Sequence, residues 1–435
     1  MLLGHRPSLF PAGALEFDEK RHAAILGATG SGKSTLLTKI AIEQVRSGGP
    51  LFVVDPHGTL VSSVIPYVPL SRLRNVVLFD PLDPQKQIGL NPLTHGDEVA
   101  ASAFIEILAN QSGPNSFMAR SRDIATNFLF AAIHVLPDPC PFDLALMFAF
   151  DEYARDIFER CPIAWLRRWG ADHFSKPDKQ REEAEAAPSN KANALVTMTK
   201  LRHIFAQTDG LDFLEAMQTK KLVFFSLRKG QIGEEAANLL GSVVIRMILT
   251  AALQRDPLAK NDHCLIIADE FHNFTKGGTG PDQLLSESRK YAVSFILADQ
   301  TFGQLSESAV RQIFTNVSTL VSFCVSFEDA QTLAGELRVQ EPSTLIELPT
   351  GTFYAKVKWP EVVLTNQHVE MRPWYRSADR KRKYPQHLPA KLGNEARPSD
   401  CERYSSENHG VPRTTVEARI NTSLEAAKAA ERRAA

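Results

Sequence analysis

A glycine-rich segment near the amino end carries the clearest chemistry in this chain. Residues 27–35 read GATGSGKST and match the pattern G-x-x-x-x-G-K-[S/T]. The apolar run 23–26 precedes them and residues 36–40 have a helical pattern, so the segment reads as strand, loop and helix. Glycines let successive backbone N–H groups turn towards one anion, and the helix directs its positive end to the same place. The segment therefore predicts a site for the triphosphate of a nucleotide, with a magnesium ion.

Individual residues of this loop have expected tasks. Lys33 would reach the β- and γ-phosphates, the Ser34 hydroxyl would ligate Mg2+, and Thr35 would lie near the α-phosphate. The alternative is a chance glycine loop before a helix, which the strand and helix on either side disfavour. The predicted nucleotide-binding residues are Gly27, Ala28, Thr29, Gly30, Ser31, Gly32, Lys33, Ser34 and Thr35.

Two carboxylates follow a later apolar run. Asp269 and Glu270 come directly after residues 264–268, which read as a buried strand. In a nucleotide hydrolase, Asp269 would hold Mg2+ beside Ser34, and Glu270 would orient and polarise the attacking water. The alternative is a solvated strand end without a catalytic task. Paired with the glycine loop, the two carboxylates favour hydrolysis over binding alone.

Two more residues are candidates for the same reaction. Gln300 ends the strand-like run 294–299, and the ends of neighbouring parallel strands lie side by side, so its amide could sense the γ-phosphate or the water. Arg289 lies in the amphipathic run 285–291 and could reach the γ-phosphate of a neighbouring subunit, as an arginine finger does. The plain alternatives are an idle polar strand end and a surface charge on a helix.

Composition and charge limit the classes of partner. The 435 residues are 43% hydrophobic and 23% charged, which is typical of a globular protein. The net charge of −1 lacks the basic character of a nucleic-acid coat, although a ring that grips DNA with a few channel loops needs none. The five cysteines contain no C-x-x-C pair, which argues against a disulfide framework or zinc site and fits the cytoplasm. No stretch has the pattern of a signal peptide or membrane span.

The pattern of elements divides the chain into segments. Residues 1–96 and 216–370 alternate strands with helices, which predicts one α/β nucleotide-binding domain with a mostly parallel sheet. Residues 97–215 have helical patterns almost throughout and read as an inserted all-α domain. Residues 371–435 are polar and charged and are expected to form a largely flexible tail, with a short Ala-rich helix at 415–434.

Basic residues suggest two places for DNA contacts. A cluster in the tail mixes cations with aromatic rings, which can hold phosphates and stack on bases. A solvated charged tail is the more ordinary interpretation of such a run. Arg228 and Lys229, which follow the apolar run 222–227, are alternative contacts. The cluster comprises Arg372, Arg376, Arg380, Lys381, Arg382 and Lys383, with Trp374, Tyr375 and Tyr384 among them.

Several motifs, in order along the chain, resemble those of motor ATPases of the HerA–FtsK group. The last two narrow the resemblance to the conjugative DNA-transfer coupling proteins of type IV secretion, the TraG/TraD class. The motifs are DPHG at 55–58, DPLD at 80–83, GLNPL at 89–93, DEFHNF at 269–274, LLSESRKY at 284–291 and ADQ at 298–300.

The resemblance spans about residues 20–360 and implies a RecA-like P-loop motor with an inserted all-α domain. It also implies a homo-hexameric ring that uses ATP and Mg2+ to move DNA through a central channel, with secretion or relaxosome proteins as partners. Membrane coupling proteins usually begin with transmembrane helices, which this sequence lacks, so we expect a soluble relative or one that docks at the inner membrane through a separate subunit. The implied hydrolytic residues are Lys33, Ser34, Asp269 and Glu270, with Gln300 as sensor glutamine and Arg289 as trans-acting arginine.

Two other functions stay open at this point. A HerA-like translocase would use the same motor with a separate nuclease partner, in repair or phage defence. A nucleotide-gated scaffold would bind ATP without moving DNA, and Glu270 argues against it because a positioned carboxylate serves hydrolysis.

Overall fold

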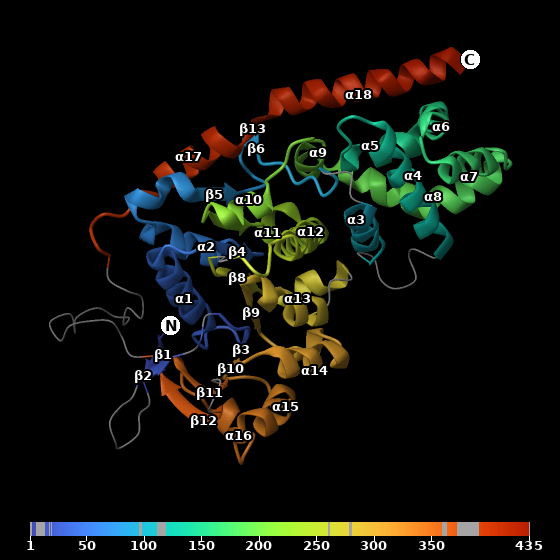
Figure 1. Cartoon of the computed structure of the whole chain (residues 1–435). Helices are drawn as coiled ribbons and strands as arrows, with labels where there is room; N and C mark the ends of the chain where they lie inside the picture. Colours follow the sequence, from blue (N-terminus) through green and yellow to red (C-terminus); the bar gives the residue numbers. More distant parts are fainter. Residues whose placement is uncertain are drawn as a thin grey trace.

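The computed structural model describes residues 2–5, 14–16, 18, 20–94, 98–110, 119–259, 262–277, 281–358, 363–371 and 391–434. Within these residues, thirteen strands form one large sheet and one small sheet (Figure 1). The strands are β1 (Leu2–His5), β2 (Ala14–Glu16), β3 (Ala23–Leu26), β4 (Leu51–Asp55), β5 (Val76–Phe79), β6 (Lys86–Gln87), β7 (Leu222–Ser226), β8 (Cys264–Asp269), β9 (Val293–Asp299), β10 (Thr319–Ser322), β11 (Thr352–Lys358), β12 (Val363–Glu370) and β13 (Val411–Pro412).

The large sheet has the order β2-β1-β12-β11-β10-β3-β9-β8-β4-β7-β5. Every pair from β10 to β5 is parallel, whereas the pairs among β10, β11, β12, β1 and β2 are antiparallel. The small sheet pairs β6 with β13. The predicted α/β class with a mostly parallel sheet is therefore confirmed.

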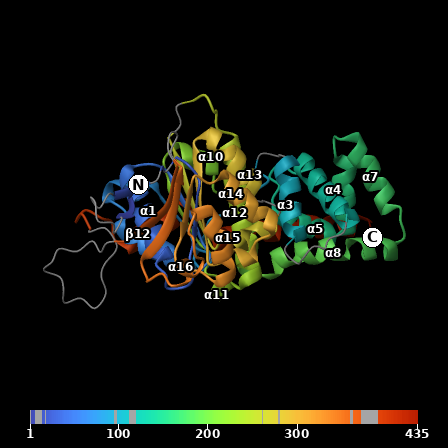
Figure 2. The same cartoon turned by 90° about the horizontal axis from the view of Figure 1, so that it is seen from below.

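Helices cover both faces of the large sheet, which explains why its central strands are apolar almost throughout. Along β3, Ala24 and Leu26 belong to one buried core, whereas Ala23 and Ile25 belong to the other. The second core is shared with α1 (Lys33–Ser47), α2 (Thr59–Val64) and α17 (Pro398–His409). Figure 2 shows α1 on one side of the sheet and helices of the first core on the other. The first core includes α12 (Glu234–Leu253), α13 (Pro281–Glu287), α14 (Glu307–Asn316) and α15 (Phe327–Leu337).

The remaining elements of the α/β part are short and connect these layers. They are η1 (Ile65–Tyr67), η2 (Leu70–Asn75), α10 (Phe213–Gln218), α11 (Lys229–Ile232), η3 (Phe271–Gly277), η4 (Ser288–Tyr291), η5 (Phe302–Gln304) and α16 (Ser343–Ile346).

Between β6 and α10, every described element is a helix, in the segment that we interpret as an inserted domain. Its first helix, α3, packs against α12 and η3 and so joins the helical group to the sheet part. Figure 1 shows the group to one side of the sheet. The helices are α3 (Glu98–Asn110), α4 (Ala119–Val135), α5 (Pro141–Ala149), α6 (Asp151–Arg160), α7 (Ala164–Phe174), α8 (Asp178–Thr197) and α9 (Thr199–Phe205).

The carboxyl-terminal segment differs from the flexible tail expected from the sequence. Helix α17 packs on the edge strand β5, and the amide of Leu78 donates to Ser405 Oγ at 2.6 Å. Helix α18 (Arg413–Ala434) lies along the helical group, where Glu417 accepts from His203 (Figure 1). Helix α18 corresponds to the Ala-rich helix expected at 415–434, whereas the tertiary contacts that order the segment leave no local sequence pattern. The basic cluster predicted at 372–384 lies outside the described residues.

One described helix has the length and composition of a membrane span, which the sequence had not led us to expect. Helix α12 has a mean hydropathy of 1.8 over its most apolar window, of which 78% is buried inside the fold. Its apolar residues belong to the first core and pack against η3 and α3.

We predict that acid destabilises the protein through His22. The ring is 2% exposed, and Nδ1 accepts from the amide of Phe295 at 3.0 Å, which requires an unprotonated nitrogen. Burial, then the charges of Arg289 and His263, lower the pKa of His22 from 6.5 to about 4. Because the unfolded chain binds the proton first, this contribution is complete above pH 6.5 and is lost between pH 6.5 and 4, by up to about 3 kcal/mol.

The measurement is the free energy of unfolding by denaturant at pH 7 and pH 4.5. His22→Asn is the matched variant, because its amide oxygen can accept from Phe295 without titrating. We expect a smaller loss on acidification in His22→Asn than in the natural chain. Equal losses would contradict the assignment to His22.

Candidate active site at the carboxyl edge of the sheet

The predicted residues meet at one edge of the sheet. Strands β3, β9, β8 and β4 are neighbours and parallel, so the segments that follow them emerge side by side. They enclose a cavity of about 680 Å³. Its lining includes Ala28, Thr29, Gly30, Gly32, Lys33, Ser34, Thr35, His57, Thr59, Arg228, Gly230, Gln231, Asp269, Glu270, Gln300 and Thr350.

The glycine loop has the backbone of an anion cradle. Gly30 and Gly32 have φ angles of 80° and 115°, in the left-handed region that favours glycine. Gly32 begins α1 without a side-chain cap, so the first amides of this helix are available to a ligand. Within the described residues, Ser31 Oγ is buried without a hydrogen-bond partner. A phosphate would satisfy such groups, as at other helix amino termini.

Lys33 and Asp269, which both line the cavity, form an ion pair. Nζ lies 2.9 Å from Oδ1, and both side chains are less than one-tenth exposed. Each charge compensates the other in a place that water reaches poorly. An incoming anion would compete with Asp269 for the ammonium, and a divalent cation would compete with Lys33 for the carboxylate.

Glu270 is held by donors from three segments. Oε1 accepts from Gln300 Nε2 at 2.8 Å, and Oε2 lies 3.1 Å from His57 Nε2 and 3.3 Å from Asn273 Nδ2. Burial raises the pKa of this carboxyl, but the charge of His57 and the hydrogen bond from Gln300 outweigh it, so the pKa lies below its usual value. Glu270 is therefore an anion at neutral pH, as a group that orients water must be.

Gln300 and Asp55 place the donors around Glu270. Gln300 Oε1 accepts from Thr29 Oγ1 at 3.1 Å, so its amide joins the glycine loop to Glu270. Asp55 accepts from the amides of His57 and Val61 at 2.9 and 3.0 Å, which fixes the turn that carries His57. Burial raises the pKa of Asp55, and the backbone donors offset part of that rise.

Arg289 is the one predicted catalytic residue that the structure does not bring to this cavity. It is exposed in η4, at the amino end of β9, whereas the cavity lies at the carboxyl ends of the strands. Its charge lowers the pKa of the His22 ring, which also lies at the amino edge. In this chain Arg289 thus lies at the edge of the sheet opposite its own cavity.

Several cavity and supporting residues were not predicted as site residues. The sequence could have indicated His57, because it follows the strand that ends at Asp55. It could also have indicated Asn273, since three residues after Glu270 is one turn of a 3-10 helix. Thr350 comes from the turn before β11, and no local pattern connects it with the glycine loop.

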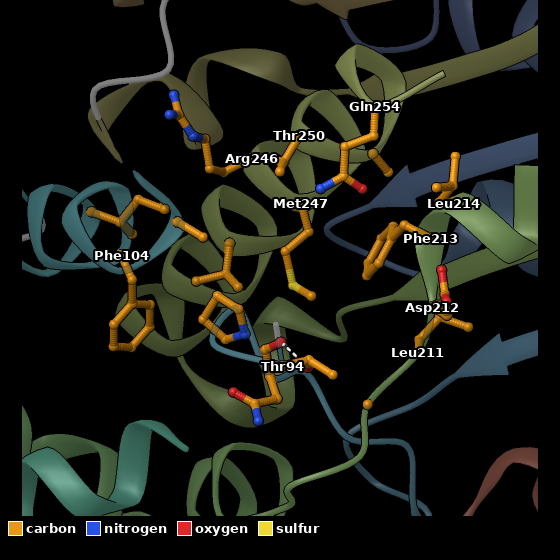
Figure 3. Close-up of a pocket in the computed structure, with 17 residues that line it drawn as sticks. Thr94, Phe104, Leu211, Asp212, Phe213, Leu214, Arg246, Met247, Thr250 and Gln254 are labelled. Carbon is orange, nitrogen blue, oxygen red and sulfur yellow. Dashed lines mark hydrogen bonds between the residues drawn. The ribbon is translucent and has the colours of Figure 1, made fainter. Parts of the chain in front are cut away.

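A second cavity lies between α3, α10 and α12, apart from this edge. It has a volume of about 120 Å³ and a mostly apolar lining, with Met247 and Phe213 on facing sides (Figure 3). At its lower end, Thr94 Oγ1 donates to the carbonyl of Asn91 at 2.7 Å. None of the predicted site residues lines this cavity.

A family model matches residues 15–337, most of the chain. Its description is the type IV secretion-system coupling protein DNA-binding domain. The chain belongs to this coupling-protein family. The match includes the glycine loop, the helical insertion and the strands that carry Asp269 and Gln300. A comparison with curated protein sequences finds no match.

Solved structures resemble this coupling-protein domain in fold. The bacterial conjugative coupling protein TrwB, in complex with ADP and Mg2+, matches with a TM-score of 0.62 and 17% identity, over 81% of this chain and 86% of that one. The unbound form of TrwB matches with a TM-score of 0.61 and 17% identity, over 81% of this chain and 85% of that one. VirB4 of Thermoanaerobacter pseudethanolicus matches with a TM-score of 0.56 and 13% identity, over 85% of this chain and 95% of that one. These likenesses confirm the predicted RecA-like P-loop fold.

The donors of this coupling-protein domain suit Mg2+. The Ser34 hydroxyl and the Asp269 carboxylate line one cavity, and both supply the oxygen ligands that Mg2+ prefers. Among the residues that the structure describes, no three His, Cys, Asp or Glu side chains gather into a metal site. Mg2+ commonly binds one or two protein ligands together with phosphate oxygens. A metal at this place would therefore bind together with a nucleotide.

We predict that Gly32→Ala destabilises the coupling-protein domain more than Gly30→Ala. Both positions have positive φ, so each alanine carries a backbone cost of about 1–2 kcal/mol. A Cβ at Gly30 meets nothing within 4 Å, whereas at Gly32 it lies 2.8 Å from Met371 Cε, 3.1 Å from Phe323 and 3.2 Å from Gly351 Cα. Overpacking adds a further ~1–3 kcal/mol at Gly32. Denaturant unfolding without nucleotide measures the difference, and equal losses would contradict the packing described.

Proposed function

We propose that this chain is an ATP-hydrolysing motor that moves DNA in conjugative transfer by type IV secretion. The observation that carries the proposal is the meeting of Lys33, Asp269, Glu270 and Gln300 around one cavity beside the glycine loop. Membership of the coupling-protein family supports DNA as the partner. The similar TrwB structures, which hold ADP with Mg2+ or an ATP analogue, support the nucleotide.

Within this proposal each side chain has one task. Bound MgATP supplies the phosphoryl group that is transferred to water. The amides of residues 30–34 and the Lys33 ammonium hold the β- and γ-phosphates, Thr35 lies near the α-phosphate, and Ser34 and Asp269 face the metal. Glu270 orients the attacking water and accepts its proton. Gln300 connects the phosphate loop to Glu270, because its amide accepts from Thr29 and donates to the Glu270 carboxylate.

The same geometry supports a ring of subunits. Arg289 is exposed at the edge of the sheet opposite its own cavity, so from this place it can act on a bound nucleotide only in a neighbouring subunit. We propose that the ring is a homo-hexamer in which Arg289 stabilises the transferred phosphoryl group in trans. We further propose a cytoplasmic ring that reaches the inner membrane through secretion partners.

We predict that Glu270→Gln separates nucleotide binding from hydrolysis. The substitution keeps the shape of the side chain but removes the anion that accepts a proton, so the ATPase rate falls about 100-fold or more. Affinity for a non-hydrolysable ATP analogue stays within a few-fold of the natural value. Lys33→Ala is the matched variant, because it removes the phosphate-binding cation and is expected to lose both activities.

Steady-state ATPase assays and calorimetry measure these two quantities. In the natural chain, the rate per subunit should also rise with DNA and with protein concentration. Full hydrolysis by Glu270→Gln, or a rate indifferent to both additions, would contradict the proposed motor. A DNA-indifferent ATPase would favour the nucleotide-gated scaffold. Nuclease genes beside this one, in place of relaxase genes, would favour the HerA-like alternative.

A further inference from the structure

Glu270, the carboxylate that we propose orients the attacking water, already has hydrogen-bond partners at both of its oxygens. Gln300 donates to Oε1, and His57 and Asn273 lie at hydrogen-bond distance from Oε2. A carboxylate orients water through a free lone pair in the right direction, and each donor occupies such a direction. These donors occupy three of about four such directions and leave none on Oε2, so a water that approaches Oε2 requires that His57 or Asn273 moves away from Glu270.

Asn273 is the donor with the most closely defined position. It is 2% exposed and follows Glu270 by one turn of η3, with its own amide donating to the Glu270 carbonyl at 3.0 Å. Its side-chain Nδ2 donates to that carbonyl at 3.0 Å as well as to Oε2. An amide can present its N–H groups to Glu270 only while its oxygen faces the opposite direction.

Lys229 lies where that oxygen points. Its Nζ is 3.2 Å from Asn273 Oδ1, and an ammonium has donors but no acceptor. This contact specifies the orientation of the Asn273 amide, because the reversed amide would place N–H groups against the ammonium. Lys229 thus keeps the Asn273 donor directed at Glu270.

The Lys229 side chain is also partly exposed to solvent. Its side chain is 20% exposed, and Nζ lies 3.4 Å from Glu234, whose side chain is 61% exposed. Lys229 begins α11, in the segment between β7 and α12, and its neighbours Arg228 and Gly230 line the nucleotide cavity. An anion that arrives from solvent can therefore compete with Asn273 for this cation.

We propose that Lys229 and Asn273 form a positioning relay that restrains Glu270 until a DNA phosphate draws Lys229 away. This inference rests on the proposed function. Binding of Lys229 to a phosphodiester leaves Asn273 Oδ1 without its cation, the amide turns, and Oε2 of Glu270 loses a donor. Neither residue touches the nucleotide in this scheme, and both act through the direction in which Glu270 points.

The test compares ATPase rates of the full chain with and without DNA oligonucleotides, single-stranded and duplex. In Lys229→Met the rate without DNA should rise about tenfold or more, as expected for loss of one hydrogen bond to a charged group. The rate at saturating DNA should stay near the natural value, so the stimulation ratio falls by the same factor. Because Lys229 acts on Glu270, kcat changes while KM for ATP stays constant.

Matched variants separate this relay from a general structural effect. Lys229→Arg keeps a donor for Asn273 and is expected to keep both the low basal rate and the stimulation. Lys221→Met removes a lysine from the other end of β7, where Nζ reaches the carbonyl of Arg74, and should leave both rates unchanged. Asn273→Ala should resemble Lys229→Met, provided that its thermal unfolding shows a folded chain.

The outcomes distinguish the relay from the motor. A natural chain without DNA-stimulated ATPase overturns the proposed function and the relay together. A natural chain that responds to DNA, with an unchanged stimulation ratio in Lys229→Met, overturns the relay alone. A lower basal rate in Lys229→Met also overturns it, because that result indicates a supporting role for the lysine.

Discussion

The ion pair between Lys33 and Asp269 is the contact on which the site depends. The two residues are 236 positions apart, and the register of three parallel strands brings them together. Leu26 pairs with Asp299 across β3 and β9, and Ala298 pairs with Asp269 across β9 and β8. The strands therefore end level with one another, and the loops after them share one cavity. A register shift of one residue would turn the Asp269 side chain to the other face.

The same edge explains how Glu270 can respond to events elsewhere. Its donors come from the segments after β4, β8 and β9, and Asn273 extends the network to the segment after β7. Helix α3 of the helical group packs on η3, the element that carries Asn273. The Glu270 carboxylate thus lies where the cavity, the loop after β7 that carries Arg228 and Lys229, and the helical group meet. A small movement of η3 would shift Asn273 and so change the orientation of the Glu270 side chain.

The sequence predicted those features of the fold and the site that leave a pattern among neighbouring residues, and missed those that depend on contacts between distant segments. The glycine loop and the acidic pair have fixed spacing beside apolar strands, so their place at the carboxyl edge followed from parallel-sheet topology. Met371 and Gly351 also pack on this loop, but they come from beyond residue 337, where the family match ends, and no periodicity links them to it. Helix α18 was expected from the Ala-rich sequence at 415–434, but the partners that hold α17 and α18 against the fold exist only in the folded chain.

The most direct test of the central claim is the effect of Mg2+ on nucleotide affinity. If the glycine loop and Asp269 close around one magnesium triphosphate, Mg2+ strengthens binding of a non-hydrolysable ATP analogue to the natural chain. In Asp269→Asn, which keeps the shape but lowers the charge, most of that strengthening should disappear. Calorimetric titrations with and without Mg2+ measure both values. The same Mg2+ effect in both chains would contradict the account.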